Sequence, residues 1–296
     1  MGCLFMRRDG KKIKVESVEY ALTPHIMPER NDSLNFIEVD IPLQPMQDYL
    51  IAKRKEGHKL SHLALIIAAY TRVLGEFPQM NRFIVNKNVY ARNELNVGMV
   101  VLKAGQMDNG TMSKVNLDPA DTIFEVNEKM MKYIDTNKNS EEANSTDKLA
   151  GTLVSIPGLL RFGVNVFRWA DKHGLLPRAI IDASPFHASV SITNLASIRT
   201  NHIFHHIYNF GTTGVFIAMG NSREVPKRNL DGEIYFEKCM PLGVVMDERI
   251  CSGSYFAMAF KQFRKYLANP ELMEVKPDPD KVIREIPYRK DKYPVE

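Results

Sequence analysis

The sequence predicts an α+β fold with a mixed sheet. Helix and strand patterns follow one another without the regular βαβ alternation of a doubly wound protein, and the second half is rich in strand patterns. Hydrophobic residues make up 44% of the 296 residues and charged residues 25%. That balance is typical of a globular protein with a sizeable core and argues against disorder.

The first half of the chain predicts two helices after a strand. Residues 34–41 partly alternate between apolar and polar side chains, as a half-buried strand does. A helix is expected at 42–57, and Ser61 is suited to cap a second helix through Glu76 that is apolar over most of its circumference. The next predictions are, in order, strands at 82–85 and 95–103, a helix from Asp118-Pro119 to Asp135, a surface loop at 135–147, and a helical stretch at 149–174 broken near Pro157 and Gly158.

Strand patterns then dominate until a final helix. Strands are expected at 186–194, 213–219 and 233–246, with Asp231-Gly232 as a hairpin turn into the last of them. The final helix, at 253–267, has an apolar face at i, i+3, i+4, i+7 and i+11 and ends at Asn269-Pro270. We therefore expect three regions: a polar N-terminal arm at 1–30, one domain at 31–275, and a surface tail at 276–296.

Charge and cysteine content exclude several function classes. The excess of Lys+Arg over Asp+Glu is 39 − 35 = +4, too small to indicate nucleic-acid binding, and we interpret the basic run of Arg7, Arg8, Lys11, Lys12 and Lys14 as solvated. The longest apolar stretch, 149–169, is interrupted by Pro157, Gly158, Arg161 and Gly163, so no membrane span is expected. Three cysteines without metal-ligand spacing indicate a cytoplasmic protein without a metal site.

Four segments, read in order, resemble a known family. Residues 77–81 with 97–101 are similar to the "P-E-L-N … V-G-V-A-V" region of the dihydrolipoamide acyltransferase catalytic domain, and 189–196 to its "T-F-T-I-S-N-L-G". Residues 215–220 are similar to its "A-I-L-A-V-G" strand, and 231–253 to its "D-G-E … M-P-L … D-H-R-V-I-D-G". Chloramphenicol acetyltransferase has an "H-H-A-V-C-D-G" form of the last motif. The resemblance covers about residues 31–272 and identifies the CoA-dependent acyltransferase superfamily.

This resemblance implies a chloramphenicol acetyltransferase-like two-layer sandwich that assembles as a homotrimer. In that family CoA and the acyl acceptor enter a channel at each subunit interface from opposite ends. A motif histidine removes a proton from a thiol or hydroxyl, a hydroxyl of the neighbouring subunit stabilises the oxyanion, and a motif aspartate pairs with an arginine. The layout resembles a free-standing catalytic domain, so no lipoyl attachment is expected.

Two motif positions depart from the family. Glu248 occupies the position of the histidine, and Ser252 that of the aspartate, next to Gly253. An imidazole titrates near neutral pH, whereas a carboxylate needs an apolar environment to act as a base there. Arg30 is the candidate for the arginine, and it is expected to meet Ser252 or to pair with Glu248 instead. Thr193 corresponds to the oxyanion hydroxyl.

Further residues are candidates for the channel. Ser191 lies two residues from Thr193 on the same strand face, and Asn194 follows it. His187 leads into that strand, and His25 lies in a Pro-His pair like one near the start of the family's domain. A compact histidine run at 202–206 lacks the partners of a zinc site. Cys251 is expected to be a small buried packing residue.

The sequence thus predicts a protein that binds acyl-CoA or a related thioester at a trimer interface and transfers the acyl group to a small acceptor. Glu248 would be the base and Thr193 the oxyanion donor. The alternative is an inactive binding or scaffold homologue that keeps the fold and the trimer. A third hypothesis, a nucleic-acid or membrane-surface protein that uses the basic N-terminus, has little support.

Overall fold

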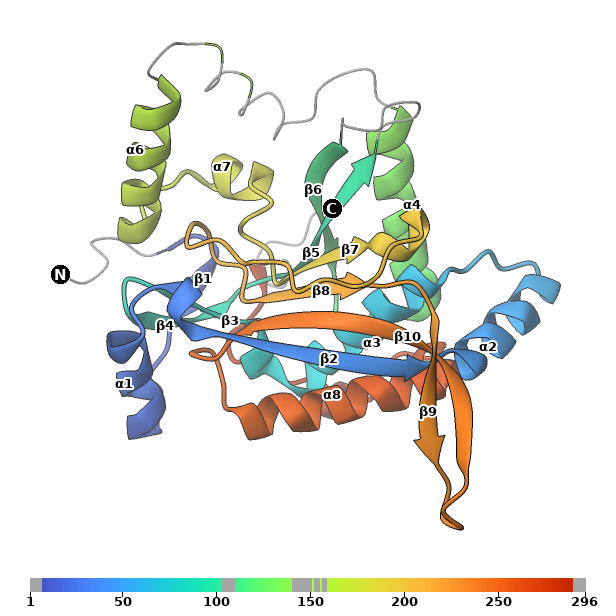
Figure 1. Ribbon diagram of the computed structural model, residues 1–296. Coiled ribbons are helices and arrows are strands. Elements are labelled where there is room, and N and C mark those ends of the chain that lie inside the picture. Colours follow the sequence, from blue (N-terminus) through green and yellow to red (C-terminus); the bar gives the residue numbers. More distant parts are fainter. Residues whose placement is uncertain (1–6, 103–109, 140–150, 152–154, 156–158, 290–296) are drawn as a thin grey trace.

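The computed structural model describes residues 7–102, 110–139 and 159–289, together with Gly151 and Ser155. The described chain forms a large mixed sheet, a layer of helices on one of its faces, and a small second sheet (Figure 1). The α+β fold with a mixed sheet that the sequence predicts is therefore confirmed.

The large sheet has the strand order β2-β10-β8-β7-β5-β6, and β9 also pairs with β10. β7 runs parallel to both its neighbours, and every other pair is antiparallel. β9 and β10 form a hairpin that projects beyond the body of the sheet (Figure 1). The strands span β2 Leu34–Pro42, β5 Leu95–Leu102, β6 Gly110–Leu117, β7 Val190–Asn194, β8 Val215–Met219, β9 Arg223–Arg228 and β10 Ile234–Asp247.

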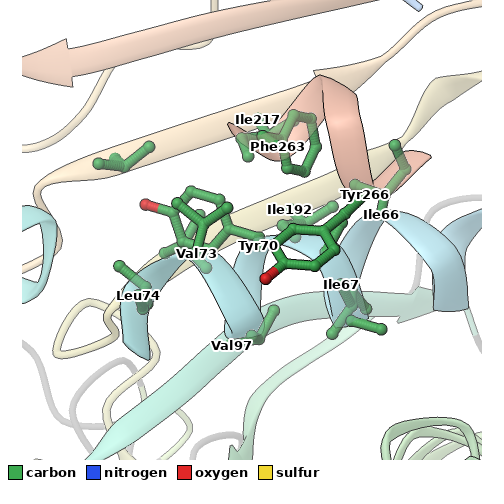
Figure 2. Close-up of a cluster of buried hydrophobic side chains, with 14 of the residues drawn as sticks. Ile66, Ile67, Tyr70, Val73, Leu74, Val97, Ile192, Ile217, Phe263 and Tyr266 are labelled. Carbon is green, nitrogen blue, oxygen red and sulfur yellow. The ribbon is translucent and has the colours of Figure 1, made fainter. Parts of the chain in front are cut away.

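Helices cover one face of this sheet and form the main core with it. α3 (His62–Glu76) begins at Ser61, whose hydroxyl accepts a hydrogen bond from the Ala64 amide, and it is buried on nearly every side. It packs against α8 (Gly253–Ala268), where the ring of Tyr70 meets that of Phe263 edge to face (Figure 2). Burial of this apolar surface is the main source of stability. The other α-helices of the described residues are α1 Val18–Ile26, α2 Leu43–Lys55, α4 Ile123–Asn139, α6 Leu159–His173 and α7 Arg178–Ala183.

Strand side chains alternate between the two faces of the sheet. On β10, Val244 and Met246 point into the helical core, whereas Val245 packs with Phe216 of β8 on the opposite face. An extended segment, residues 199–214, crosses that opposite face, and we call it the strap. It lies so close that a Cβ added to Gly243 would meet the Ile203 carbonyl oxygen at 2.2 Å.

The N-terminal region is folded against the domain rather than extending from it. β1 (Gly10–Lys12) pairs with β4 (Asn88–Arg92), which pairs with β3 (Arg82–Val85) to complete the small sheet. Our interpretation of the basic run as solvated is wrong for Arg7, which is buried and ion-paired to Asp9 and Asp171, while Lys11, Lys12 and Lys14 are exposed.

The C-terminal region also contacts the domain. Glu285 pairs with Arg82, the Ile283 amide donates to the Gly75 carbonyl, and the Tyr288 side chain is buried. The predicted loop at 135–147 is wrong at its start, because α4 continues to Asn139. The rest of that loop and the predicted break near Pro157 and Gly158 lie outside the described residues.

Candidate active site

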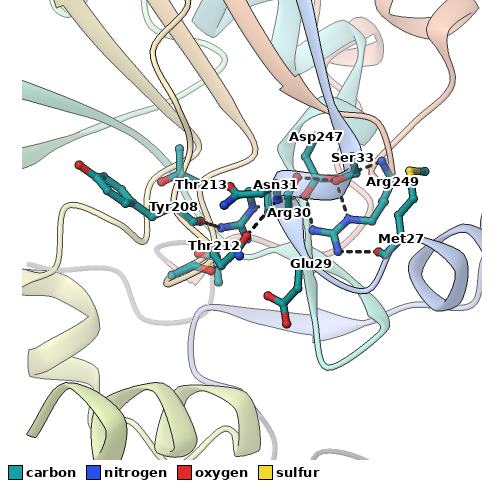
Figure 3. Close-up of polar contacts among 12 residues, drawn as sticks. Met27, Glu29, Arg30, Asn31, Ser33, Tyr208, Thr212, Thr213, Asp247 and Arg249 are labelled. Carbon is teal, nitrogen blue, oxygen red and sulfur yellow. Dashed lines mark hydrogen bonds and ion pairs between the residues drawn. The ribbon is translucent and has the colours of Figure 1, made fainter. Parts of the chain in front are cut away.

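The C-terminal end of β10 carries a buried cluster of opposite charges. The Asp247 carboxylate lies between two guanidinium groups, with Oδ2 3.4 Å from Arg30 Nε and 2.8 Å from Arg249 Nη2 (Figure 3). The Ser33 hydroxyl donates to Asp247 Oδ1 at 2.9 Å. All four side chains are buried. Burial alone would raise the pKa of Asp247, but the hydrogen bond and charge of Arg249 and the charge of Arg30 outweigh burial and lower it.

Arg30 also connects this cluster to the strap. Its guanidinium donates to the carbonyl oxygens of Tyr208 and Gly211, the latter at 3.0 Å. Burial lowers the pKa of Arg30, although Asp247 opposes that shift. Because the side chain makes several directed hydrogen bonds, it fixes the strap relative to the end of β10.

The expected partner of Arg30 is therefore wrong. Arg30 pairs with neither Ser252 nor Glu248, because Asp247 lies closer and compensates its charge. Ser252 instead caps α8, and its hydroxyl accepts a hydrogen bond from the Tyr255 amide at 3.1 Å. Gly253 is the first residue of α8, where an added Cβ would meet open space.

Glu248 follows Asp247 in a turn and is partly buried. Its backbone amide donates to the Ser33 carbonyl oxygen at 2.9 Å, which fixes the position of its backbone. Within the described part of the chain its carboxylate forms no ion pair. Tyr20 of α1 lies near this residue: burial, the charge of Glu19 and the charge of Glu248 all raise the pKa of its phenol. The carboxylate is thus adjacent to polar side chains and is not neutralised by a cation.

Thr193 lies on the strap side of the sheet. Val190 and Ile192 of β7 point into the helical core, so Ser191 and Thr193 face the other way. They line a cavity of about 290 Å³ with Gly98, His205 and Phe216. The His205 ring stacks on that of Phe216, with 4.1 Å between centroids. Asn194 lies at the end of the strand, where its side chain accepts from the Ser197 amide.

Thr193 and Glu248 lie toward opposite ends of the sheet in one copy of the chain. The strand register places Thr193 beside Ala218, and Ala218 beside Gly243. From Gly243 the strand β10 continues to Asp247, about 13 Å further on, and Glu248 follows. The two side chains are therefore too far apart to contact one carbonyl group within a single copy of the chain.

The other predicted channel residues are dispersed. His25 is exposed on α1, whereas His187 is fully buried beside Ser184 and Asp171 and does not line the cavity next to Thr193. Cys251 is buried, and burial raises the pKa of its thiol. The described residues contain no cluster of potential metal ligands and no helix long and apolar enough to cross a bilayer.

Sequence reasoning missed Asp247 and Ser33 as partners of Arg30, and Tyr20 as a neighbour of Glu248. Asp247 is the first residue of the recognised motif, and this position could have indicated it as a candidate partner of Arg30. Ser33 and Tyr20 lie more than 200 residues from the motif, and no local pattern indicates their contact with it.

Comparisons with known proteins agree with this fold. Residues 186–275 match the family model of the 2-oxoacid dehydrogenases acyltransferase catalytic domain. A probable dihydrolipoamide acetyltransferase from Listeria monocytogenes is similar, with 15% identity, a TM-score of 0.54, and coverage of 87% of this chain and 94% of that one. No curated protein sequence is significantly similar to this chain.

Two further solved structures are comparably similar. One is the cubic core of the pyruvate dehydrogenase multienzyme complex, with 14% identity, a TM-score of 0.56, and coverage of 88% of this chain and 94% of that one. The other is a chloramphenicol acetyltransferase, with 10% identity, a TM-score of 0.54, and coverage of 87% and 99%. The resemblance that the motifs indicate is thereby confirmed for the fold and for the matched segment.

Proposed function

The chain has the fold of the CoA-dependent acyltransferases, and from that premise we propose that it binds an acyl-CoA or a related pantetheine thioester and transfers the acyl group to a small acceptor. The site forms between copies of the chain in a homotrimer. Glu248 of one copy acts as the base, and Thr193 of its neighbour donates to the oxyanion.

The observation that carries this proposal is the separation of the two residues within one protomer. Thr193 and Glu248 lie about 13 Å or more apart along the strand direction. Base and oxyanion donor must both reach the reacting carbonyl, so a second copy has to supply one of them. The core of a multienzyme complex among the similar structures supports self-association.

The proposed reaction needs one proton transfer and one bond exchange. Glu248 accepts the proton of the acceptor thiol or hydroxyl, whose sulfur or oxygen then attacks the thioester carbonyl carbon. The Thr193 hydroxyl donates a hydrogen bond to the oxyanion as it forms. The C–S bond breaks, and the CoA thiolate takes the proton from Glu248.

The charge cluster next to Glu248 supports its role as a base. Asp247 neutralises Arg30 and Arg249, so neither guanidinium pairs with Glu248. An ion pair would have stabilised the ionised carboxylate and weakened it as a base. The hydrogen bond between the Glu248 amide and Ser33 fixes the backbone from which the side chain extends.

An assay of acetyl transfer from acetyl-CoA to dihydrolipoamide tests the proposal, with the release of free CoA as the measured quantity. We expect Glu248→Gln to lower turnover by about 10²- to 10⁴-fold and Thr193→Ala by about 10²- to 10³-fold, with CoA binding retained in both. Glu224→Gln and Thr200→Ala, at exposed positions, are the controls and should retain turnover.

A mixing experiment tests whether the site is shared between copies. Oligomers assembled from equal amounts of Glu248→Gln and Thr193→Ala chains should regain activity at about one quarter of their sites, since a shared site can take each intact residue from a different chain. Mixed oligomers without activity would contradict the shared site. CoA binding without any turnover of the unmodified protein would favour the inactive homologue.

A further inference from the structure

Three side chains away from Glu248 and Thr193 lie next to one another. The Ser184 hydroxyl lies 2.7 Å from Nδ1 of His187, and Nε2 of the same ring lies 3.3 Å from Oδ1 of Asp171. All three residues are buried, and His187 is fully so. A hydroxyl, an imidazole and a carboxylate in this order are the components of an activated serine nucleophile.

The charge on Asp171 sets the tautomer of the imidazole. Arg7 Nη2 lies 2.8 Å from Asp171 Oδ1. Burial alone would raise the pKa of Asp171, but the neighbouring His187 ring and the charge of Arg7 lower it well below its usual range. The ionised carboxylate beside Nε2 favours the tautomer with its proton on that nitrogen, so Nδ1 carries the lone pair that faces the Ser184 hydroxyl. At 3.3 Å the contact does not have the geometry of a hydrogen bond in this conformation, and catalytic contacts of this kind often align only when substrate binds.

Hydrogen bonds hold the turn that carries Ser184 and His187 in one conformation. The Lys114 ammonium donates to the carbonyl oxygens of Ile181 at 2.7 Å and His187 at 3.0 Å. Near the C-terminal end of the strap, the amides of Thr212 and Thr213 donate to the Phe186 carbonyl oxygen at 2.8 and 3.1 Å. A catalytic group held on both sides in this way loses little freedom when substrate binds.

Ser184 also lines an apolar cavity of about 600 Å³ between α6, α7 and the strap. Val164 and Phe167 of α6, Ile180 of α7, and Phe186 and Phe210 form much of its lining. The volume lies in the range of small-molecule sites, and the lining suits an unbranched or branched hydrocarbon chain. A nucleophile at the wall of an apolar cavity combines a reactive group with a place for an apolar substrate.

We propose that Ser184 is the nucleophile of a second site, which hydrolyses esters or thioesters of apolar carboxylic acids. The Ser184 oxygen attacks the carbonyl carbon while its proton passes to His187 Nδ1. The bond from that carbon to the leaving oxygen or sulfur breaks, and the leaving group takes the proton from His187. Water then attacks the carbonyl carbon of the acyl-serine ester while His187 Nδ1 takes a proton from it. The bond from that carbon to the Ser184 oxygen breaks, His187 gives the proton to this oxygen, and the free acid is released.

This site requires neither Glu248 nor Thr193 and goes beyond the proposed acyl transfer. Asp171, Ser184 and His187 come from α6, from the end of α7 and from the turn after it. The two cavities are neighbours, but Thr193 lines only the first and Ser184 only the second. The lining residues that they share are Phe186, His206, Ile207, Tyr208 and Phe210. Variants of one site therefore distinguish it from the other.

The experiment labels the full chain with an alkyl fluorophosphonate and locates the adduct by mass spectrometry of peptides. We expect one modified serine, Ser184, and loss of the adduct in Ser184→Ala. Glu248→Gln and Ser197→Ala, the second at an exposed serine, should label like the unmodified protein. Hydrolysis of p-nitrophenyl octanoate should fall at least about 10²-fold in Ser184→Ala and in His187→Gln.

The variant Ser184→Cys is a control for the possibility that Ser184→Ala loses its labelling because it unfolds. This variant keeps a nucleophile in the same position, and we expect it to form a thioester adduct with octanoyl-CoA that peptide mass spectrometry detects. An adduct on another serine, or ester hydrolysis unchanged in Ser184→Ala, would overturn the proposal. Loss of labelling in Ser184→Ala with unchanged transfer to dihydrolipoamide would support it independently of the first site.

Discussion

Arg30 Nε lies 3.4 Å from Asp247 Oδ2, and this ion pair joins the segment before β2 to the end of β10. Asp247 also pairs with Arg249 at 2.8 Å. One buried carboxylate thus compensates two buried guanidinium groups, and Arg30 reaches the strap from the same position. The arrangement leaves the next residue, Glu248, outside any ion pair in the described part of the chain.

Removing the carboxylate of Asp247 should destabilise the protein strongly. Asp247→Asn leaves Arg30 and Arg249 buried without a counter-charge, and breaking a buried pair in this way costs about 3–5 kcal/mol. The free energy of unfolding in urea measures it. Asp40→Asn is the control, because Asp40 pairs with the half-exposed Arg223 and should cost at most about 1 kcal/mol. Equal losses in the two variants would contradict the role of burial.

Stability should decrease in acid because buried carboxylates hold their charge. Arg249 and Arg30 lower the pKa of Asp247 against the effect of burial, and Arg7 does the same for Asp9. Below the ordinary aspartate pKa of about 3.9 the unfolded chain binds protons that the folded chain does not, so this contribution is complete above about pH 5 and is lost as the pH falls further. Urea unfolding between pH 7 and pH 3 measures the decline.

The free energy of unfolding should also depend less steeply on pH between pH 7 and pH 3 in Asp247→Asn than in the unmodified protein. The variant has no carboxyl group to protonate at that position, so one of the linked groups is gone. An unchanged slope of stability against pH would show that Asp247 titrates alike in the folded and unfolded chain.

Local patterns were sufficient to predict most elements of the large sheet and the helices that cover it. The apolar periodicity and the Ser61 cap predicted α3 correctly, and Asp231-Gly232 predicted the hairpin into β10. The elements that were missed are β1, β4, β6, β9, α1 and α7. α1 contains Pro24, which is unfavourable inside a helix, and its apolar residues Val18, Leu22 and Ile26 are exposed instead of packing on the core.

The candidate site was predictable only where a linear motif carries it. Glu248 and Thr193 follow from motif positions, but the partner of Arg30 depends on a contact across 217 residues. The sequence did not indicate a catalytic role for Ser184, because a serine, a histidine three residues later and a distant aspartate do not form a known motif. Their contact exists only after α6 and α7 pack beside the strap.

Two tyrosines of the core allow the energetic effect of an unpaired hydroxyl to be measured. Tyr70 is only 1% exposed, and its hydroxyl has no hydrogen-bond partner among the described residues (Figure 2). The Tyr133 hydroxyl donates to the Met99 carbonyl oxygen at 2.9 Å. Burying a hydroxyl without a partner costs about 1–3 kcal/mol, whereas a hydrogen bond contributes about 1 kcal/mol.

The two phenylalanine variants should therefore shift stability in opposite directions. Tyr70→Phe removes a polar atom that burial penalises and keeps the ring that packs on Phe263, so the free energy of unfolding should rise by about 1 kcal/mol. Tyr133→Phe leaves the Met99 carbonyl without this donor and should lower it by about 1 kcal/mol. Urea unfolding of both variants and of the unmodified protein at pH 7 measures these two changes in the free energy of unfolding. If Tyr70→Phe destabilises the protein as much as Tyr133→Phe, the Tyr70 hydroxyl has a partner in solution, and a buried water would be the first candidate.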